Sequence, residues 1–197
     1  MNYLAHLFLG DRSPEGFIGS LLGDFRKDLC WDCYSPTVLH GIDLHQKIDI
    51  FTDRHPIFRT SKRLIDPSRR RVAGIILDVF YDHCLAQHWS DYSSMPLDRF
   101  TNLVYQALQT HQEILPTRLQ AALPFMIRQD WLGSYRSLSG VALTLQRIAR
   151  RLRRETAIDR SLEDLQLHYE ALDQSFQSFF PDLQTYVQQV MVGATEG

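Results

Sequence analysis

Apolar residues recur every three or four positions along most of this chain, which is the spacing of one face of an α-helix. One such stripe runs from Val72 to Phe80, and another runs from Leu162 to Phe179. Alternation of apolar and polar residues long enough for strands is absent, and the sequence contains no Asn-Gly or Asp-Gly hairpin turn. The pattern therefore predicts an all-α protein.

Helix start signals divide this pattern into segments. Capping hydroxyls precede proline or early acidic residues at Ser13-Pro14, Ser35-Pro36 and Ser161. The signals and the periodicity together predict helices over 2–10, 14–24, 36–53, 56–65, 68–90, 95–113, 117–135, 139–154 and 162–179, with a short one after Pro181. With 44% hydrophobic residues and no repeat or linker, we expect residues 1–197 to form one compact multi-helix domain.

The composition also bears on where the protein works. No apolar run approaches the roughly 20 residues that span a bilayer, and the start MNYLAHLFLG lacks the features of a signal peptide. An odd number of cysteines, Cys30, Cys33 and Cys84, predicts free thiols in a reducing compartment. We therefore expect a soluble cytoplasmic protein. The Cys30-x-x-Cys33 spacing also fits half a zinc site or a redox pair.

Histidine and aspartate residues concentrate in the first half of the chain, which holds six of the eight histidines. His45, Asp49 and Asp53 are spaced i, i+4, i+8 within one predicted helix. Each step of four rotates only about 40° around the axis, so the three side chains lie on one side. Asp78 and Asp82 repeat the same spacing in a later helix.

Carboxylates along otherwise apolar helices need positive partners, because burying them alone costs several kcal/mol. Arg71 precedes Asp78 by seven residues, and we expect it to pair with a carboxylate of that stripe. A divalent metal ion is the simplest partner for the others, since Asp oxygens and His nitrogens are ordinary ligands. Caps, salt bridges and solvated faces are the alternative explanation.

The adjacent pair Asp82-His83 points to a class of metal enzyme. In HD-type metal phosphohydrolases, an early histidine and a later Asp/His pair on separate helices bind a metal that activates water against phosphorus. His6, Asp24 and His45 lie upstream of the pair in this chain. The dipeptide alone is a weak signal, and its helical context gives it value.

Five stretches carry a closer resemblance: MNYLAHL, GSLLGDF, GIDLHQKIDIFTDRHP, RRRVAGIILDVFYDHCLAQHW and LHYEALDQSFQSFFP. Through them the chain resembles the acyl-carrier-protein phosphodiesterase family, which is distantly related to HD-domain phosphohydrolases. The resemblance implies an HD-like fold and hydrolysis of the phosphodiester that joins 4′-phosphopantetheine to a serine of holo-acyl carrier protein. It implies a divalent cofactor, Mn²⁺ first, with Mg²⁺, Fe²⁺ and Co²⁺ as further candidates. Phe8 stands where some members have a second histidine, and the Cys30–Cys33 segment departs from the pattern.

The resemblance and the spacing together give each site residue a predicted role. The predicted metal ligands are Asp24, His45, Asp82 and His83. His6 is predicted to be an extra ligand or the proton donor to the departing serine. Asp49 or Asp78 would orient a ligand or accept the proton of water, and Arg71 would pair with a phosphate oxygen.

Charge is segregated along a chain whose formal net charge is −2. Residues 116–160 carry nine arginines against three acidic residues, whereas residues 161–197 carry six acidic residues and no Lys or Arg. The densest cluster comprises Arg147, Arg150, Arg151, Arg153 and Arg154. It predicts either a solvated or internally paired face, or a docking surface for an acidic partner such as holo-acyl carrier protein. A pI of about 6.4 and the lack of a nucleic-acid motif argue against nucleic acid.

Two other functions remain open from the sequence. One is an HD-like phosphohydrolase acting on a small nucleotide or phosphoester, and the other is a metal-free helical module that binds an acidic protein. The sequence does not indicate an oligomeric state.

Overall fold

Helices make up all the regular structure in residues 1–152 and 156–195, which are the residues that the computed structural model describes. The predicted all-α class is confirmed, and the helices enclose one continuous hydrophobic core. The α-helices are α1 Tyr3–Leu9, α2 Pro14–Leu22, α3 Pro36–Arg54, α4 Pro56–Ser61, α5 Ala73–Gln87, α6 Trp89–Tyr92, α7 Leu97–Thr110, α8 Thr117–Arg128, α9 Leu138–Ala149, α10 Leu162–Leu167 and α11 Tyr169–Thr195. Short 3₁₀ helices connect them: η1 Gly23–Asp28, η2 Trp31–Cys33, η3 Lys62–Leu64, η4 Pro67–Val72, η5 Gln112–Ile114, η6 Gly133–Arg136 and η7 Ile158–Arg160.

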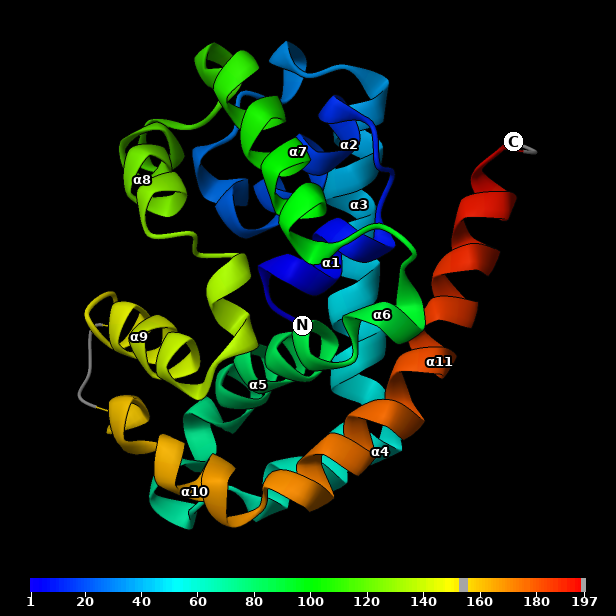
Figure 1. Ribbon diagram of the computed structural model, residues 1–197. Helices are drawn as coiled ribbons and strands as arrows, with labels where there is room; N and C mark the ends of the chain where they lie inside the picture. The colour runs from blue at the N-terminus through cyan, green and yellow to red at the C-terminus, as the bar shows by residue number, and fades with distance from the viewer. Residues whose placement is uncertain (153–155, 196–197) are drawn as a thin grey trace.

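The short helix α1 lies at the centre of the molecule. In Figure 1 the pair α2–α3 lies on one side of it and α5 lies on the other, next to the N-terminus. Every residue of α1 from Leu4 to Leu9 is buried. A helix this short is unstable alone, so its position depends on what surrounds it.

Helices α2 and α3 pack unusually close together because glycines face each other. A Cβ atom at Gly19 would lie 2.4 Å from the carbonyl oxygen of Val38 and 2.9 Å from the Cα of Gly41. Real Cβ atoms do not approach other atoms this closely. The two glycines therefore set the spacing of the helix pair that carries the histidine and aspartate residues discussed below.

Asp82 of α5 supplies the N-terminal cap of α1. Its carboxylate accepts backbone N–H groups of Asn2 at 3.2 Å, Leu4 at 2.7 Å and Ala5 at 3.2 Å. The side chain of Asn2, in the capping position, makes no capping bond and donates instead to the hydroxyl of Tyr135 at 2.8 Å. A fully buried carboxylate thus satisfies the free N–H groups of a helix that lies far upstream in the chain.

The predicted helix over 68–90 divides into three elements. Residues 67–72 form η4, α5 begins only at Ala73, and α6 follows Gln87 after one residue. Arg71 therefore lies on η4 and not on α5, and its side chain is exposed. The expectation that Arg71 extends the stripe of Asp78 is wrong, because a 3₁₀ helix rotates about 120° per residue and breaks the α-helical register.

Other helix ends also differ from the prediction. The helix predicted over 117–135 stops at Arg128, and Asp130 then adopts a left-handed conformation with φ of 42°. The segment predicted over 162–179 is interrupted at His168, and α11 continues through Pro181 to Thr195. Pro181 is exposed, so the carbonyl that lacks a helical partner can be hydrated.

The cysteines do not all remain thiols. Cys30 and Cys33 form a disulfide across η2, with their Cα atoms 5.5 Å apart, and Cys84 is free and buried. The prediction of three free thiols is therefore wrong for Cys30 and Cys33. The short helix explains the pairing, because it brings two residues three positions apart within bridging distance.

Within the described residues, none of the helices combines the length and the apolar character needed to cross a lipid bilayer.

The capping role of Asp82 makes a stability prediction. Asp82→Ala leaves the N–H groups of Asn2, Leu4 and Ala5 at the start of α1 without an acceptor, and we expect it to lower the free energy of unfolding by about 3 kcal/mol. Asp82→Asn keeps one carbonyl oxygen as an acceptor, so its free energy of unfolding should lie between those of Asp82→Ala and wild type. The exposed Asp91→Ala is the matched control and should change stability by less than about 0.5 kcal/mol. Urea unfolding followed by circular dichroism measures the difference, and equal stability of Asp82→Ala and wild type would contradict the capping role.

Candidate functional site

A cavity of about 390 Å³ opens where α1, η1, α3 and α5 meet. Four aspartates from three different elements line it: Asp24, Asp49, Asp53 and Asp78. The remaining lining residues are Met1, Asn2, Tyr3, Phe25, Thr52, Ile75, Val79, Arg118, Ile148 and Arg151. The cavity is therefore strongly acidic on one side and carries two arginines.

Helix α3 places its polar side chains as the spacing predicts. Asp49 and Asp53 both line the cavity, and His45 lies one turn before Asp49, with its Nε2 3.4 Å from Asp49 Oδ2. Asp53 lies at the outer edge, where its exposed carboxylate is 3.4 Å from Lys62 Nζ. Pro36 and the capping hydroxyl of Ser35 begin the helix.

The ring of His45 is held in one orientation by backbone atoms of the preceding elements. Its Nδ1 lies 2.7 Å from the carbonyl oxygen of Ser20, which can only accept, so Nδ1 carries hydrogen and donates. Gly23 packs against the ring, because a Cβ there would lie 2.2 Å from the ring's Cγ. The other nitrogen, Nε2, therefore faces Asp49 and also Asp24, whose Oδ1 is 3.7 Å away.

A second histidine stacks on the first. The rings of His6 and His45 are parallel within 8°, with centroids 3.6 Å apart. His6 Nε2 lies 3.1 Å from the carbonyl oxygen of Met1 and 3.2 Å from Asp49 Oδ1, so this nitrogen donates. His6 Nδ1 is buried and has no hydrogen-bond partner in the part of the chain that the structure describes. Burial and the neighbouring His45 lower the pKa of His6 to about 3, so the ring is neutral at neutral pH.

The electrostatics favour positive charge at His45. Burial alone would lower its pKa, but hydrogen bonding to Asp49 and the charge of Asp24 outweigh burial and raise the pKa of His45. Although burial acts against it, hydrogen bonds from the two histidines hold the pKa of Asp49 well below its usual range. The surrounding protein keeps water away from the carboxylate of Asp24, and this burial raises its pKa. The site thus holds one carboxylate firmly ionised and a second that protonates more readily.

Asp78 has a different cation from the one predicted. The amino group of Met1 donates to Asp78 Oδ1 at 2.8 Å and lies 3.8 Å from Asp49 Oδ1. Arg71 forms no ion pair among the described residues, so the expected pairing with a carboxylate of the Asp78 stripe is wrong. The break between η4 and α5 accounts for the difference. Burial raises the pKa of Asp78 despite the nearby amino group.

Asp82 and His83 lie outside this cluster. The carboxylate of Asp82 caps α1, and burial raises its pKa to about 7. His83 is buried between other partners, with Nδ1 2.6 Å from the carbonyl oxygen of Tyr135 and Nε2 3.0 Å from the hydroxyl of Tyr169. Both side chains have their polar atoms engaged in hydrogen bonds. This geometry gives no support to their predicted role as metal ligands, which stays a prediction.

The donor atoms that do come together fit a divalent cation. His6, His45 and Asp49 each bring one ligand atom within 4.8 Å of the others. An imidazole whose second nitrogen donates to a backbone carbonyl is the usual arrangement of a metal-binding histidine. Either a proton or a cation at Nε2 of His45 would reduce the repulsion between the carboxylates of Asp24 and Asp49. Nitrogen and oxygen donors together suit Mn²⁺, Fe²⁺ and Co²⁺.

Sequence reasoning missed several contributors to the site. Gly23 and the carbonyl of Ser20 orient His45 without any reactive side chain of their own. Tyr3, which lines the cavity and whose pKa is raised to about 12 mainly by burial, comes from the N-terminal segment. Arg118 comes from α8, well downstream of every predicted ligand. Tertiary packing alone brings these residues together, and no spacing in the sequence signals it.

Comparison with known proteins identifies the relatives. A family model described as acyl carrier protein phosphodiesterase matches residues 1–183. A protein of that name from Photorhabdus laumondii is 34% identical over 92% of both chains. Proteins of the same name from Enterobacter sp. and Escherichia coli O6:H1 are each 35% identical over 92% of this chain and 94% of their own.

No solved structure matches the chain, so the predicted HD-like character of the fold stays a prediction. The family match covers every residue of the histidine and aspartate cluster. The chain belongs to the acyl carrier protein phosphodiesterase family.

Proposed function

We propose that this protein hydrolyses the phosphodiester between 4′-phosphopantetheine and a serine of holo-acyl carrier protein, in a reaction that needs a divalent cation. One observation carries the proposal within the family: His45 Nε2 is fixed toward the carboxylates of Asp24 and Asp49 at 3.7 and 3.4 Å. Such a group attracts a cation next to a cavity large enough for a phosphodiester. A carrier-protein substrate also goes with the predicted cytoplasmic location.

His45 and Asp49 would hold the cation, with Mn²⁺ as the first choice, and Asp24 would lie beside it as a base. His6 acts through Asp49, because its Nε2–H bond fixes the orientation of that carboxylate. When bound, the cation supplies Lewis-acid activation of water and neutralises charge on the phosphoryl oxygens. Ser20 and Gly23 orient the ring of His45, so the chain holds this ligand in place before the cation arrives.

The reaction needs one group that accepts a proton from water and a proton for the departing serine oxygen. Asp24 is the better acceptor for the proton of the attacking water, because its pKa is raised whereas that of Asp49 is lowered. A bond forms between water oxygen and phosphorus, the bond from phosphorus to the serine oxygen breaks, and the proton passes to the serine oxygen. The products are apo-acyl carrier protein and 4′-phosphopantetheine. His6 is a poor proton donor, since it is buried and neutral.

The arginines near the end of α9 fit an acidic protein partner. Arg147 lies over the ring of Trp131 at 4.7 Å, and with Arg150 it lines a surface hollow of about 300 Å³. Arg151 lines the acidic cavity, so this basic surface adjoins the site. Arg153 and Arg154, which belong to the same predicted surface, lie outside the described residues.

Internal pairing does not use up this basic surface. The acidic segment that follows it pairs elsewhere: Asp164 accepts two hydrogen bonds from Arg69, at 2.7 and 2.9 Å, and Asp173 lies 2.9 Å from His88 Nε2. Within the described residues, Arg150 and Arg151 form no ion pair with residues 161–195. These arginines therefore remain available to carboxylates on a partner.

Metal binding tests the proposed ligand set. Calorimetric titration of chelator-treated protein with Mn²⁺ should show binding that His45→Ala and Asp49→Asn weaken by about 100-fold or more, because each removes a ligand. His40→Ala and Asp43→Asn remove the same groups from α3 outside the cavity and should bind like wild type. Asp82→Asn should also keep its affinity. Absence of Mn²⁺ binding by wild type, or weakening only in Asp82→Asn and His83→Ala, would overturn this ligand set.

Mass spectrometry of the carrier protein tests the reaction. Incubation of holo-acyl carrier protein with the enzyme and Mn²⁺ should release the arm and leave the apo form, and chelation by EDTA should stop the release. Asp24→Asn should lower kcat by about 100-fold or more, since it removes the proton acceptor. An unchanged carrier protein together with hydrolysis of a nucleotide would instead favour the small-phosphoester alternative.

Charge reversal tests the docking surface. Arg150→Glu should lower kcat/KM for holo-acyl carrier protein by about 10-fold at low ionic strength, and the loss should shrink as salt screens the interaction. Arg59→Glu makes the same charge change on α4, which is well separated from α9 in Figure 1, and should have little effect. Equal losses in the two variants would mean that net charge, and not this surface, governs the encounter.

A further inference from the structure

A second hollow of about 260 Å³ lies beside the acidic cavity and shares part of its wall. Tyr3, Phe25, Arg118 and Arg151 line both spaces. Beyond these shared residues the second hollow is entirely apolar, lined by Leu21, Leu119, Ala121, Ala122, Met126 and Trp131. A ligand can therefore extend from the acidic cavity into an apolar space without leaving the protein surface.

The shared wall carries the two arginines of the acidic cavity. Arg118 is 69% exposed, and its nearest carboxylate is that of Asp28 at 3.6 Å. Arg151 is exposed and its Cζ lies 6.0 Å from the ring of Trp131, with no ion pair among the described residues. Within the described residues neither guanidinium forms a short ion pair, and Arg151 interacts with the hydroxyl of Tyr3. Both keep donors free for an anion at the junction of the two hollows.

The cavity contains both carboxylates and arginines, and these act in opposite ways on an anionic ester. The carboxylates of Asp24, Asp49, Asp53 and Asp78 repel a phosphodiester, and a cation at His45 offsets only part of that repulsion. Arg118 and Arg151, on the wall shared by the two hollows, draw the phosphate toward themselves and set its orientation. The hydroxyl of Tyr3, on the same shared wall, adds a neutral donor.

We propose that Tyr3, Arg118 and Arg151 form the subsite for the phosphoryl oxygens, and that the adjoining apolar hollow holds the slender arm attached to that phosphate. This inference rests on the proposed function and adds how the substrate is oriented in the two hollows. The phosphorus is placed between the arginines and the carboxylates, the arm extends along α8, and the carrier protein remains on the basic surface of α9. Arg151 borders both the cavity and the basic surface, so it lies where the phosphate and the carrier protein meet.

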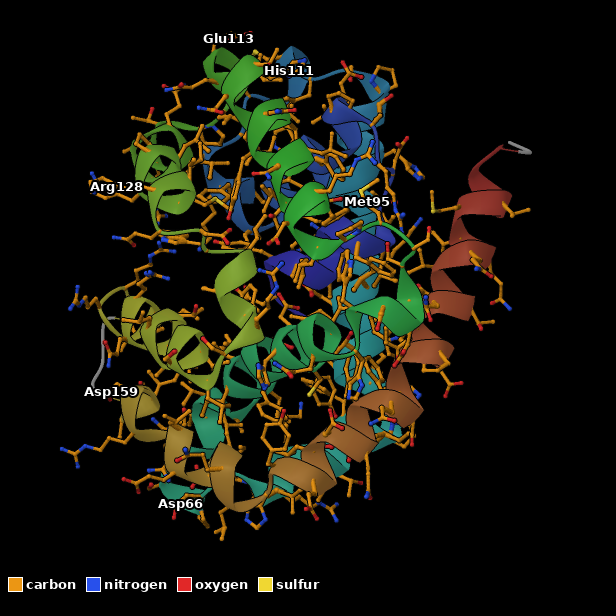
Figure 2. All side chains as sticks on the ribbon, viewed as in Figure 1. Asp66, Met95, His111, Glu113, Arg128 and Asp159 are labelled. Carbon is orange, nitrogen blue, oxygen red and sulfur yellow. A yellow bond between two sulfur atoms is a disulfide. The ribbon has the colours of Figure 1, made fainter. Side chains whose placement is uncertain are left out.

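Binding of the free product tests the anion subsite. Calorimetric titration with 4′-phosphopantetheine in the presence of Mn²⁺ should show about 10-fold weaker binding in Arg118→Gln and in Arg151→Gln than in wild type. Arg128→Gln is the matched control, because Arg128 is an exposed arginine of α8 that points outward in Figure 2 and lines neither hollow. Arg118→Lys keeps the charge but loses the paired donors and should recover only part of the affinity.

Filling the apolar hollow tests the arm separately from the phosphate. Ala122→Phe should weaken binding of 4′-phosphopantetheine by about 10-fold, because the added ring occupies the space of the arm, and should weaken binding of inorganic phosphate far less, because phosphate carries no arm. Ala171→Phe, at an exposed position of α11, controls for the added ring. Ala122→Leu replaces Ala122→Phe if urea unfolding shows that the larger side chain prevents folding.

The outcomes separate this inference from the proposed function. Wild-type protein that releases the arm from holo-acyl carrier protein, while the arginine and Ala122 variants bind 4′-phosphopantetheine as tightly as their controls, would overturn the subsite and leave the function standing. Failure of wild type to bind 4′-phosphopantetheine would overturn the subsite as well. If wild type leaves holo-acyl carrier protein intact but the variants lose product binding as expected, the subsite stands and the proposed reaction fails.

Discussion

The position of α1 depends on one buried carboxylate. Asp82 reaches from α5 to the first backbone N–H groups of α1 and holds this short helix between α5 and the α2–α3 pair. His6 and Tyr3 both belong to α1, so the same contact places the ring that stacks on His45 and the hydroxyl that borders the two hollows. Helix α1 is too short to be stable alone, so the wall that it contributes to the acidic cavity depends on the hydrogen bonds from its N-terminal end to Asp82.

Part of this arrangement could be predicted from the sequence. Helix α3 is long, capped by Ser35-Pro36 and strongly periodic, so the shared direction of His45 and Asp49 follows from local geometry alone. For Asp82 the sequence predicts metal binding, because a carboxylate beside a histidine on an apolar helix is typical of that role. That this carboxylate caps a distant helix is not visible in the local sequence, and only the tertiary contact shows it.

The rest depends on contacts across long stretches of chain. Arg71 does not pair with Asp78 because η4 and α5 are separate elements, a break that the apolar stripe does not reveal. Arg118 and Arg151 meet Tyr3 at one wall although they come from three distant segments. The strong charge segregation of the C-terminal half predicts a basic surface, but which arginine borders the cavity is decided by how α8 and α9 pack.

The contact between Gly23 and the ring of His45 limits which substitutions the site tolerates. The imidazole rests on a bare backbone, so the smallest possible change at that position, the addition of one methyl group, would push the ring out of line with Asp24 and Asp49. A search for reactive groups would pass over this residue. Attempts to alter the activity of this enzyme by substitution therefore have to leave position 23 unchanged.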